Sequence, residues 1–336
     1  MRLLQVMAGA EFGGAEAFFV RLAGALQRAG VAQKAVIRTH PTRAAELRAA
    51  GVETSELKFG GAMDWQTPRG LKREIAQFKP DIVMTWMNRA TAMCPKSAKD
   101  APFKHIARLG GYYDLKYYRA CDHLIGNTEN IVAYLVKEGW PTERAHYLPN
   151  FVDAEPAEMI RRQLHYTPET VPLILAMGRL HENKGFDILL DALARVPNAY
   201  LWIAGEGPLR AQLEKMAEEL AVKPRVRFLG WRSDIPALLA TCDLFVCPSR
   251  HEPLGNAVIE SWAHGRPVVA ADSYGPGTLI DHMESGILVP TEDAVMLAKA
   301  ICLLIGDPEL AHAVAVKGHE TLQAHFTEAA VVRQYL

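Results

Sequence analysis

The sequence is poor in cysteine and has no apolar segment long enough to cross a membrane. The cysteines number five, an odd count, and none forms a Cys-x-x-Cys pair: Cys94, Cys121, Cys242, Cys247 and Cys302. This usage argues against disulfides and structural zinc and favours a reducing cytoplasm. No run approaches the roughly 20 apolar residues of a spanning helix. The first residues resemble a β-strand more than a signal peptide, so we expect a cytoplasmic protein.

The composition shows no excess of charge that would suggest a nucleic-acid partner. The 336 residues are 49% hydrophobic and 22% charged, which predicts a folded chain of two domains. The net charge of −1 is unevenly spread: residues 1–165 carry 23 basic and 17 acidic side chains, and residues 166–336 carry 14 and 21. A basic first half and an acidic second half favour different partners for each half. Two solvated surfaces of different composition would explain the same counts.

Short apolar strand candidates alternate with amphipathic helix candidates along the chain. In the first half the strands are "LLQVMA", "QKAVIRT", "TSELKF", "DIVMTW", "KHIARL", "HLIGNT" and "AHYLPN". A proline-bearing stretch, residues 150–172, follows, and the alternation then restarts with "LILAMGRL", "AYLWIAG", "VRFLGW", "LFVCPS", "PVVAAD" and "GILVP". This pattern predicts an α/β protein of two doubly wound, Rossmann-like parallel-sheet domains, residues 1–165 and 166–325. Such sheets bind ligands at the carboxyl ends of their strands.

Several predicted strand ends carry residues suited to an anionic ligand. Gly13 and Gly14 stand where a helix begins after the first strand, without the spacing of a dinucleotide or Walker motif, and an ordinary tight turn would also explain them. Arg179 and Lys184 follow the first strand of the second half and could converge on a diphosphate. Two solvated loop charges are the alternative interpretation.

The remaining strand ends suggest contacts to a base and to hydroxyl groups. Gly205 gives a turn with room for a ligand, and Trp231 with Arg232 could lie against a flat base. The stretch "SRHEPLGNAVIESWAHG" places Glu252 before a helix that starts near Gly255 and Asn256, and Glu260 on that helix. Two carboxylates that flank the start of a helix could accept hydrogen bonds from the hydroxyls of a nucleotide sugar.

These motifs together closely resemble those of retaining glycosyltransferases of family 4, which have the GT-B fold. The resemblance rests on the Glu-x7-Glu spacing of Glu252 and Glu260, and on "GGAE", "LPNFVD", "GRLHENKG", "AGEGP", "FLGW" and "GILVP" in the same order. It spans nearly the whole chain. It implies that the first domain binds the acceptor and the second the donor. It also implies that a final helix, about residues 326–336, packs back on the first domain.

The resemblance also implies roles for individual residues. Arg179 and Lys184 would hold the donor diphosphate, and Glu252 would contact the donor sugar, which makes these three the expected catalytic residues. The other expected donor contacts are Gly255 and Asn256 near sugar and phosphate, Glu260 at the ribose, Trp231 and Arg232 near the base, Gly205, and Gly14 from the first domain.

The sequence contains no Asp-x-Asp motif, so we expect no metal and no other cofactor. The charge of the leaving diphosphate would instead be met by Arg179, Lys184 and helix N-termini. Many family members carry a histidine after the strand that corresponds to "KHIARLGGYY", but here His105 lies inside the strand and is expected to be structural. Thr278 occupies a position where an acid is common. A front-face retaining mechanism needs no enzymatic base, because the departing phosphate oxygen can take the acceptor's proton.

The basic first half suits an anionic glycan or glycolipid acceptor, or peripheral contact with the anionic inner face of a membrane. Asn88 and Arg108 are the candidate acceptor contacts. The predicted function is transfer of a sugar from a UDP-, GDP- or ADP-sugar to such an acceptor, in bacterial polysaccharide or lipopolysaccharide synthesis. Two alternatives stay open: a nucleotide-sugar 2-epimerase of the same fold, which needs no acceptor, and a sugar-binding protein without chemistry.

Overall fold

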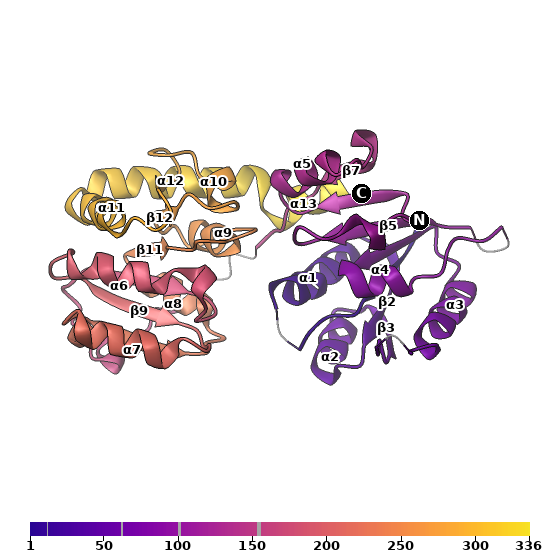
Figure 1. The fold of residues 1–336 in the computed structure, drawn as a ribbon, viewed down its shortest axis with the longest axis horizontal. Coiled ribbons are helices and arrows are strands. Elements are labelled where there is room, and N and C mark those ends of the chain that lie inside the picture. The colour runs from indigo at the N-terminus through magenta and orange to yellow at the C-terminus, as the bar shows by residue number, and fades with distance from the viewer. Residues whose placement is uncertain (12, 62, 100–101, 153–155) are drawn as a thin grey trace. The chain divides into compact units, whose positions relative to one another are not determined.

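The computed structural model describes all residues except 12, 62, 100–101 and 153–155. It divides into two compact units. Unit 1 comprises Met1–Asn150 and Val331–Leu336, and unit 2 comprises Phe151–Ala330 (Figure 1). The chain therefore passes between the units twice. Among the described residues, no helix is long and apolar enough to cross a membrane.

Unit 1 contains a seven-stranded parallel sheet in the order β3-β2-β1-β4-β5-β6-β7. Its strands are β1 (Arg2–Met7), β2 (Ala32–Arg38), β3 (Glu53–Leu57), β4 (Ile82–Trp86), β5 (Lys104–Leu109), β6 (His123–Gly126) and β7 (Ala145–Tyr147). Its helices are α1 (Gly14–Arg28), α2 (Pro41–Ala49), α3 (Gln66–Phe78), α4 (Met87–Met93), α5 (Glu129–Lys137) and the end of α13 (Glu328–Tyr335). All seven strands that the apolar runs predicted are present.

Helices cover both faces of the unit 1 sheet. Val83 on β4 packs against apolar residues of α3 and α4, among them Leu71 and Ala90. On the opposite face, the Phe18 and Phe19 rings of α1 lie 6.2 and 5.2 Å from the Trp86 ring, centroid to centroid. A parallel sheet buried on both faces requires strands that are almost continuously apolar, which is the pattern in the sequence.

Unit 2 contains a six-stranded parallel sheet in the order β10-β9-β8-β11-β12-β13. The strands are β8 (Leu173–Met177), β9 (Tyr200–Ala204), β10 (Val226–Gly230), β11 (Leu244–Cys247), β12 (Val268–Ala271) and β13 (Ile287–Val289). The helices are α6 (Phe186–Ala194), α7 (Arg210–Glu219), α8 (Ile235–Thr241), α9 (Asn256–Ala263), α10 (Pro276–Leu279), α11 (Ala294–Gly306), α12 (Pro308–His325) and the start of α13.

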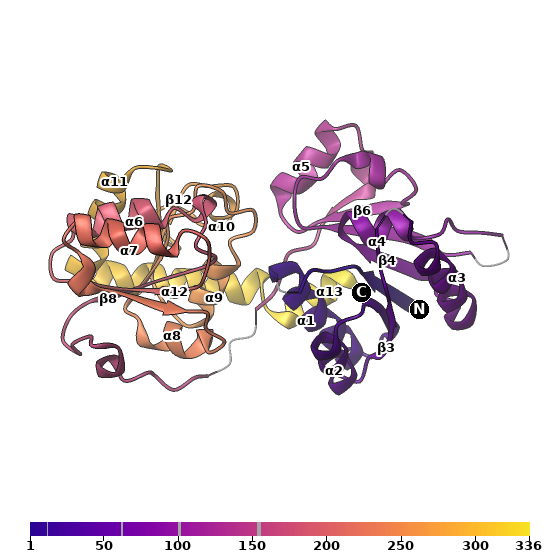
Figure 2. The ribbon, with the colours of Figure 1, turned by 60° about the horizontal axis from the view of Figure 1, so that its bottom comes forward.

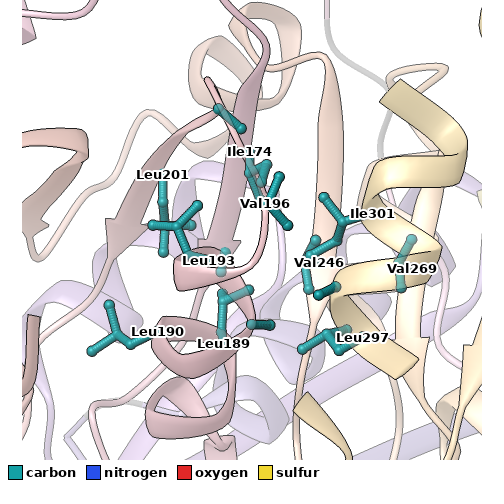
Figure 3. Packing of buried hydrophobic residues seen from close by; sticks show 14 of the residues in the cluster. Ile174, Leu189, Leu190, Leu193, Val196, Leu201, Val246, Val269, Leu297 and Ile301 are labelled. Carbon is teal, nitrogen blue, oxygen red and sulfur yellow. The ribbon is translucent and has the colours of Figure 1, made fainter. Parts of the chain in front are cut away.

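Two apolar clusters, one on each face, hold the unit 2 sheet. Residues of α6 and α11, such as Leu193 and Ile301, pack on Ile174, Leu201 and Val246 of the strands (Figure 3). The other face is covered by α8 and α9, so the strands lie between α6 and α7 on one side and α8 and α9 on the other (Figure 2). These two layers confirm the predicted doubly wound architecture.

The boundary between the units lies earlier than the sequence suggested. We expected the second domain to begin at residue 166, whereas unit 2 begins at Phe151. Residues 160–165 are tied to unit 2: Ile160 N–H donates to Thr241 Oγ1 at 2.8 Å, and Arg162 Nη2 donates to Asp243 Oδ1 at 2.9 Å. With the observed boundary, unit 1 carries 22 basic and 14 acidic residues and unit 2 carries 15 and 24, a sharper contrast than predicted.

Candidate active site

The candidate site in unit 2 lies at the change of direction of the sheet, which is the point where the order of the strands reverses. The sheet grows from β8 through β9 to β10 on one side and from β11 through β12 to β13 on the other, and β8 pairs directly with β11. The loops after these two central strands therefore diverge, and the space between them is the usual ligand site of such sheets. The loop after β8 carries Arg179 and Lys184, and the loop after β11 carries Glu252. The three residues predicted to be catalytic therefore lie on the two loops that follow the central strands.

Lys184 and Glu252 form an ion pair across these two loops. The Lys184 Nζ donates a hydrogen bond to Glu252 Oε2, and the two side chains are 26% and 13% exposed. Burial opposes the charged form of Lys184, but the Glu252 carboxylate outweighs this effect and raises the pKa of the ammonium. Lys184 is therefore a cation at neutral pH. Arg179 is exposed, and its guanidinium has no hydrogen-bond or ion-pair partner within the described part of the chain.

The two loops touch through their backbones on either side of this ion pair. Gly185 adopts a left-handed conformation with φ of 63°, and a Cβ placed there would lie 2.1 Å from the Pro248 carbonyl oxygen. His251 N–H donates to the Asn183 carbonyl at 3.1 Å. Only glycine allows this approach, so the sequence "NKGF" is required for the loops to meet.

Glycines also bring the ends of β8, β9 and β10 close together. Gly205 N–H donates to the Gly230 carbonyl at 2.8 Å, and a Cβ on Gly205 would lie only 1.9 Å from the Gly178 carbonyl oxygen. Gly205 therefore allows the backbones at the ends of these strands to pack closely. Its predicted donor contact stays a prediction.

The predicted base-binding residues follow β10 at the same edge of the sheet. Trp231 is 71% exposed. Arg232 makes a two-point ion pair with Asp234, at 2.8 Å from Nε and 2.5 Å from Nη2. This two-point pair fixes the orientation of the Arg232 guanidinium. The predicted contacts of Trp231 and Arg232 with a base stay a prediction.

Helix α9 begins at the candidate site. Gly255 is its N-cap, with φ of 69°, and Asn256 is its first residue. The Gly255 backbone packs so closely on Gly275 that a Cβ on Gly275 would lie 2.6 Å from the Gly255 nitrogen. The Glu252 carbonyl in turn accepts a hydrogen bond from Gly275 N–H at 2.6 Å. Glu260 is half-buried, one turn along α9.

In unit 1 the corresponding change of direction lies between β1 and β4. Gly13 caps α1 and Gly14 is its first, exposed residue. The buried Glu16 carboxylate holds this loop, since its Oε1 accepts a hydrogen bond from Ala10 N–H at 2.7 Å. Arg43, also buried, donates to the Ala10 carbonyl at 2.7 Å. Two buried charged side chains, Glu16 and Arg43, therefore stabilise the loop that carries the glycine pair.

The two candidate acceptor residues occupy different environments. Asn88 is half-buried on α4, and its Oδ1 accepts a hydrogen bond from the Tyr118 hydroxyl. Arg108 is 2% exposed, donates to Tyr335 Oη at 2.8 Å and to Asn150 Oδ1 at 2.6 Å, and lies over the rings of Phe18 and Trp86. This burial argues against direct contact between Arg108 and an acceptor. Arg108 instead links the residue at which the chain leaves unit 1, Asn150, to the C-terminal segment that returns to it, through Tyr335.

His105 and Thr278, where the sequence departs from the family pattern, both have local structural partners. His105 is 3% exposed, and its Nε2 lies 3.0 Å from Thr85 Oγ1. Burial lowers the pKa of this imidazole to about 4, although Asp122 acts in the opposite direction. The expected structural role of His105 is consistent with this position. The Thr278 hydroxyl donates to the Gly275 carbonyl at 2.9 Å, within the loop that supports Glu252.

Comparisons with known proteins agree with this arrangement. The family model "Glycosyltransferase Family 4" matches residues 12–156, and "Glycosyl transferases group 1" matches residues 160–321. The lipopolysaccharide core biosynthesis glycosyltransferases LpsE and LpsD of Rhizobium meliloti (strain 1021) are 39% and 36% identical, over 96% and 100% of this chain and 95% and 97% of theirs. The chain belongs to this glycosyltransferase family. HepE from Anabaena, crystallised with UDP and glucose, has the same fold, with a TM-score of 0.84, 21% identity and coverage of 100% of this chain and 98% of that one.

Sequence reasoning did not single out several residues that shape this glycosyltransferase's site. These residues are the charged side chains of Arg250, Glu16 and Arg43. Arg250 binds Asp187, which is distant in sequence, and the other two bind backbone groups of the loop before α1. The sequence signal for Arg250 was weak: Asp187 lies in the first turn of α6, three residues after Lys184, and Arg250 precedes Glu252 by two residues. Among the described residues there is no group of three or more His, Cys, Asp or Glu side chains placed to hold a metal ion.

Proposed function

We propose that this glycosyltransferase moves a sugar, with retention of configuration and without a metal ion, from a nucleotide diphosphate sugar to a growing lipopolysaccharide core or a related glycan. The observation that carries the proposal is the meeting of Lys184 and Glu252 at the change of direction of the unit 2 sheet, with the exposed Arg179 on the same loop as Lys184. The names of LpsE and LpsD support the acceptor class, and the UDP and glucose in HepE support the donor class.

In this proposal the donor diphosphate replaces Glu252 as the partner of Lys184. The ammonium already faces a carboxylate in the structure, so the site is built to hold negative charge at this point. A diphosphate carries more charge than one carboxylate, and Arg179 adds a second cation with several donors. Glu252, released from Lys184, then accepts hydrogen bonds from the hydroxyls of the donor sugar.

The other proposed donor contacts lie at α9 and at the ends of β9 and β10, with one in unit 1. Glu260 accepts hydrogen bonds from the ribose hydroxyls. The backbones of Gly255 and Asn256 at the start of α9 lie near sugar and phosphate, where helix N–H groups favour an anion. Trp231 and Arg232 meet the base beyond Gly205. Gly14 is the proposed contribution of unit 1.

The proposed chemistry uses the donor phosphate itself as the base. The bond between the anomeric carbon and the phosphate oxygen breaks, the acceptor oxygen bonds to the same face of that carbon, and the acceptor proton passes to the departing phosphate oxygen. Arg179 and Lys184 stabilise the negative charge that develops on the diphosphate. His105 is buried, and its pKa of about 4 keeps the imidazole neutral, so His105 is not the proposed base.

The acceptor side of the proposal rests on unit 1. Its net charge is positive while that of unit 2 is negative, and a basic surface attracts an anionic glycolipid or the anionic face of a membrane. Asn88, half-buried on α4 after β4, is the proposed acceptor contact of this unit.

The first experiment is a thermal-shift panel of UDP-, GDP- and ADP-sugars, followed by turnover of the stabilising donor with lipopolysaccharide core acceptors in the presence of EDTA. NMR of the product then reports the anomeric configuration. Transfer with retention in EDTA would support the proposal. Inversion, or loss of activity in EDTA, would refute it.

Lys184→Met tests the role of the ammonium. It should lower kcat by roughly 10²–10³-fold, because one preorganised contact to the leaving group is lost. The matched control is Lys215→Met, which removes an exposed lysine that pairs with Glu219 on the surface of α7. Equal activity of the two variants would remove Lys184 from the proposed mechanism.

A further inference from the structure

Arg250, two residues before Glu252, binds oxygens from the β8–α6 loop, the first turn of α6 and the β13–α11 loop. Its Nη1 and Nη2 donate to the two carboxylate oxygens of Asp187 at 2.8 and 2.6 Å. Nη1 also donates to the Glu182 carbonyl at 2.9 Å, and Nε donates to Glu292 Oε1 at 3.0 Å. Every nitrogen of the guanidinium is therefore engaged with protein, which leaves Arg250 little capacity to bind a ligand.

The contact with Asp187 has the geometry that distinguishes arginine from lysine. The two parallel hydrogen bonds form a planar, two-point ion pair, which fixes orientation as well as distance. The Arg250 and Asp187 side chains are 22% and 34% exposed, so solvent screens the pair only in part. Burial would raise the pKa of Asp187, but the hydrogen bonds from Arg250 outweigh this and lower it. The carboxylate is thus held in its charged form.

This ion pair encloses the segment that carries Lys184. Glu182 and Asp187, both bound by Arg250, lie two residues before and three residues after Lys184. On the other loop, Arg250 lies next to His251, whose N–H binds the Asn183 carbonyl. The contacts of Arg250 therefore fix both ends of the Lys184 segment against the segment that leads to Glu252.

The donor site requires a contact between these two loops that does not depend on Lys184 or Glu252. Lys184 and Glu252 pair with each other in this structure, and a donor must separate them to bind both. If that ion pair were the main tie between the loops, its exchange for a ligand would let the loops move apart. Arg250 holds the same two loops through groups that need not exchange.

We infer that Arg250 is a positioning residue of the nucleotide-sugar site. It locks the β8–α6 loop to the β11–α9 loop, so that Lys184 and Glu252 contact the same donor molecule. The inference rests on the proposed function, because it assumes that these two residues bind a nucleotide sugar. The locking of the loops can be measured without any donor.

The experiment compares Arg250→Met, Arg250→Lys, Asp187→Asn and the double variant Arg250→Met/Asp187→Asn with a matched control, Arg162→Met. Arg162 also binds a carboxylate, Asp243, and backbone carbonyls of unit 2. Asp243 directly precedes β11, however, so this contact lies at the amino ends of the strands, opposite the candidate site. Arg250→Met should raise KM for the stabilising donor by about tenfold or more, because a misplacement near 1 Å is costly at a reacting site. Arg162→Met should lower the melting temperature and leave this KM unchanged.

The remaining variants separate positioning from stability. Arg250→Lys should fall between wild type and Arg250→Met, because lysine keeps the charge without the two-point pair. The double variant should be no worse than the more damaging single substitution. Without donor, hydrogen exchange of residues 181–186 should accelerate in Arg250→Met and not in Arg162→Met. An unchanged donor KM and unchanged exchange in Arg250→Met would overturn the inference, whereas a wild-type protein that binds no nucleotide sugar would instead refute the proposed function.

Discussion

Replacement of Gly185 by alanine tests most directly whether the contact between the two central loops sets the active site. Alanine at φ of 63° would cost about 1–2 kcal/mol from backbone conformation alone. The added Cβ would also lie 2.1 Å from the Pro248 carbonyl oxygen and 3.1 Å from its carbon. Relief of the contact with the oxygen requires the loops to separate by about 1 Å, since real Cβ atoms essentially never lie within 3.0 Å of another heavy atom.

We expect two effects from this separation. The free energy of unfolding should fall by about 2–5 kcal/mol, from backbone strain together with the usual 1–3 kcal/mol of overpacking. The donor kcat/KM should fall by roughly 10²-fold, equivalent to ~2.7 kcal/mol, because the loop displaced by about 1 Å carries Lys184. Urea unfolding and steady-state kinetics with the identified donor measure the two quantities.

Gly265→Ala is the matched control for the backbone term. Gly265 has φ of 62°, and a Cβ there would meet nothing within 4 Å. This variant should lose about 1–2 kcal/mol of stability and keep its kinetics. The reasoning would be refuted if Gly185→Ala lost no more stability than Gly265→Ala and retained wild-type kcat/KM. A large stability loss with normal kinetics would show that the junction does not position Lys184.

Two further predictions concern buried polar groups of unit 1. The pKa of His105 is about 4 in the folded state, whereas an unfolded histidine protonates near pH 6.5. Between these two pH values the unfolded state therefore binds more protons than the folded state. The free energy of unfolding should fall with decreasing pH across this window, by ~1.4 kcal/mol per pH unit. His105→Gln should lack this component when urea unfolding is compared at pH 7 and pH 5, and an identical pH dependence would contradict the assignment. Tyr335→Phe removes the hydroxyl that accepts from Arg108 Nε and should cost ~1–3 kcal/mol in the same assay, whereas Tyr166→Phe, at a side chain 84% exposed, should cost nothing measurable.

The sheets were predictable because strands of doubly wound proteins are apolar throughout. Runs such as "DIVMTW" and "LFVCPS" contain too few polar residues to face solvent on either side, and both are buried strands. The meeting of Lys184 and Glu252 was also within reach, since both follow strands predicted to be parallel. Its geometry was not, because the pairing of β8 with β11 depends on strand order, which periodicity does not reveal.

Residues that act through distant partners could not be assigned from the sequence. Arg108 follows the apolar part of β5 and is a predicted acceptor contact, yet its partners Asn150 and Tyr335 are 42 and 227 residues away. The domain boundary was misplaced for the same reason. The prolines after residue 155 suggested a linker, but Ile160 and Arg162 bind residues about 80 positions later, so this stretch belongs to unit 2.

The electrostatics of the site follow from how its charges are divided. Lys184 and Glu252 neutralise each other, which satisfies two partly buried charges while no ligand is bound, since an isolated buried charge would be costly. In the proposed function, the exposed Arg179 is the cation that a diphosphate meets first. Donor binding would then exchange one ion pair for several interactions with the ligand. If Arg250 and Asp187 hold the backbone as we infer, this exchange requires no loop movement, and ligand exchange and loop position depend on different charges.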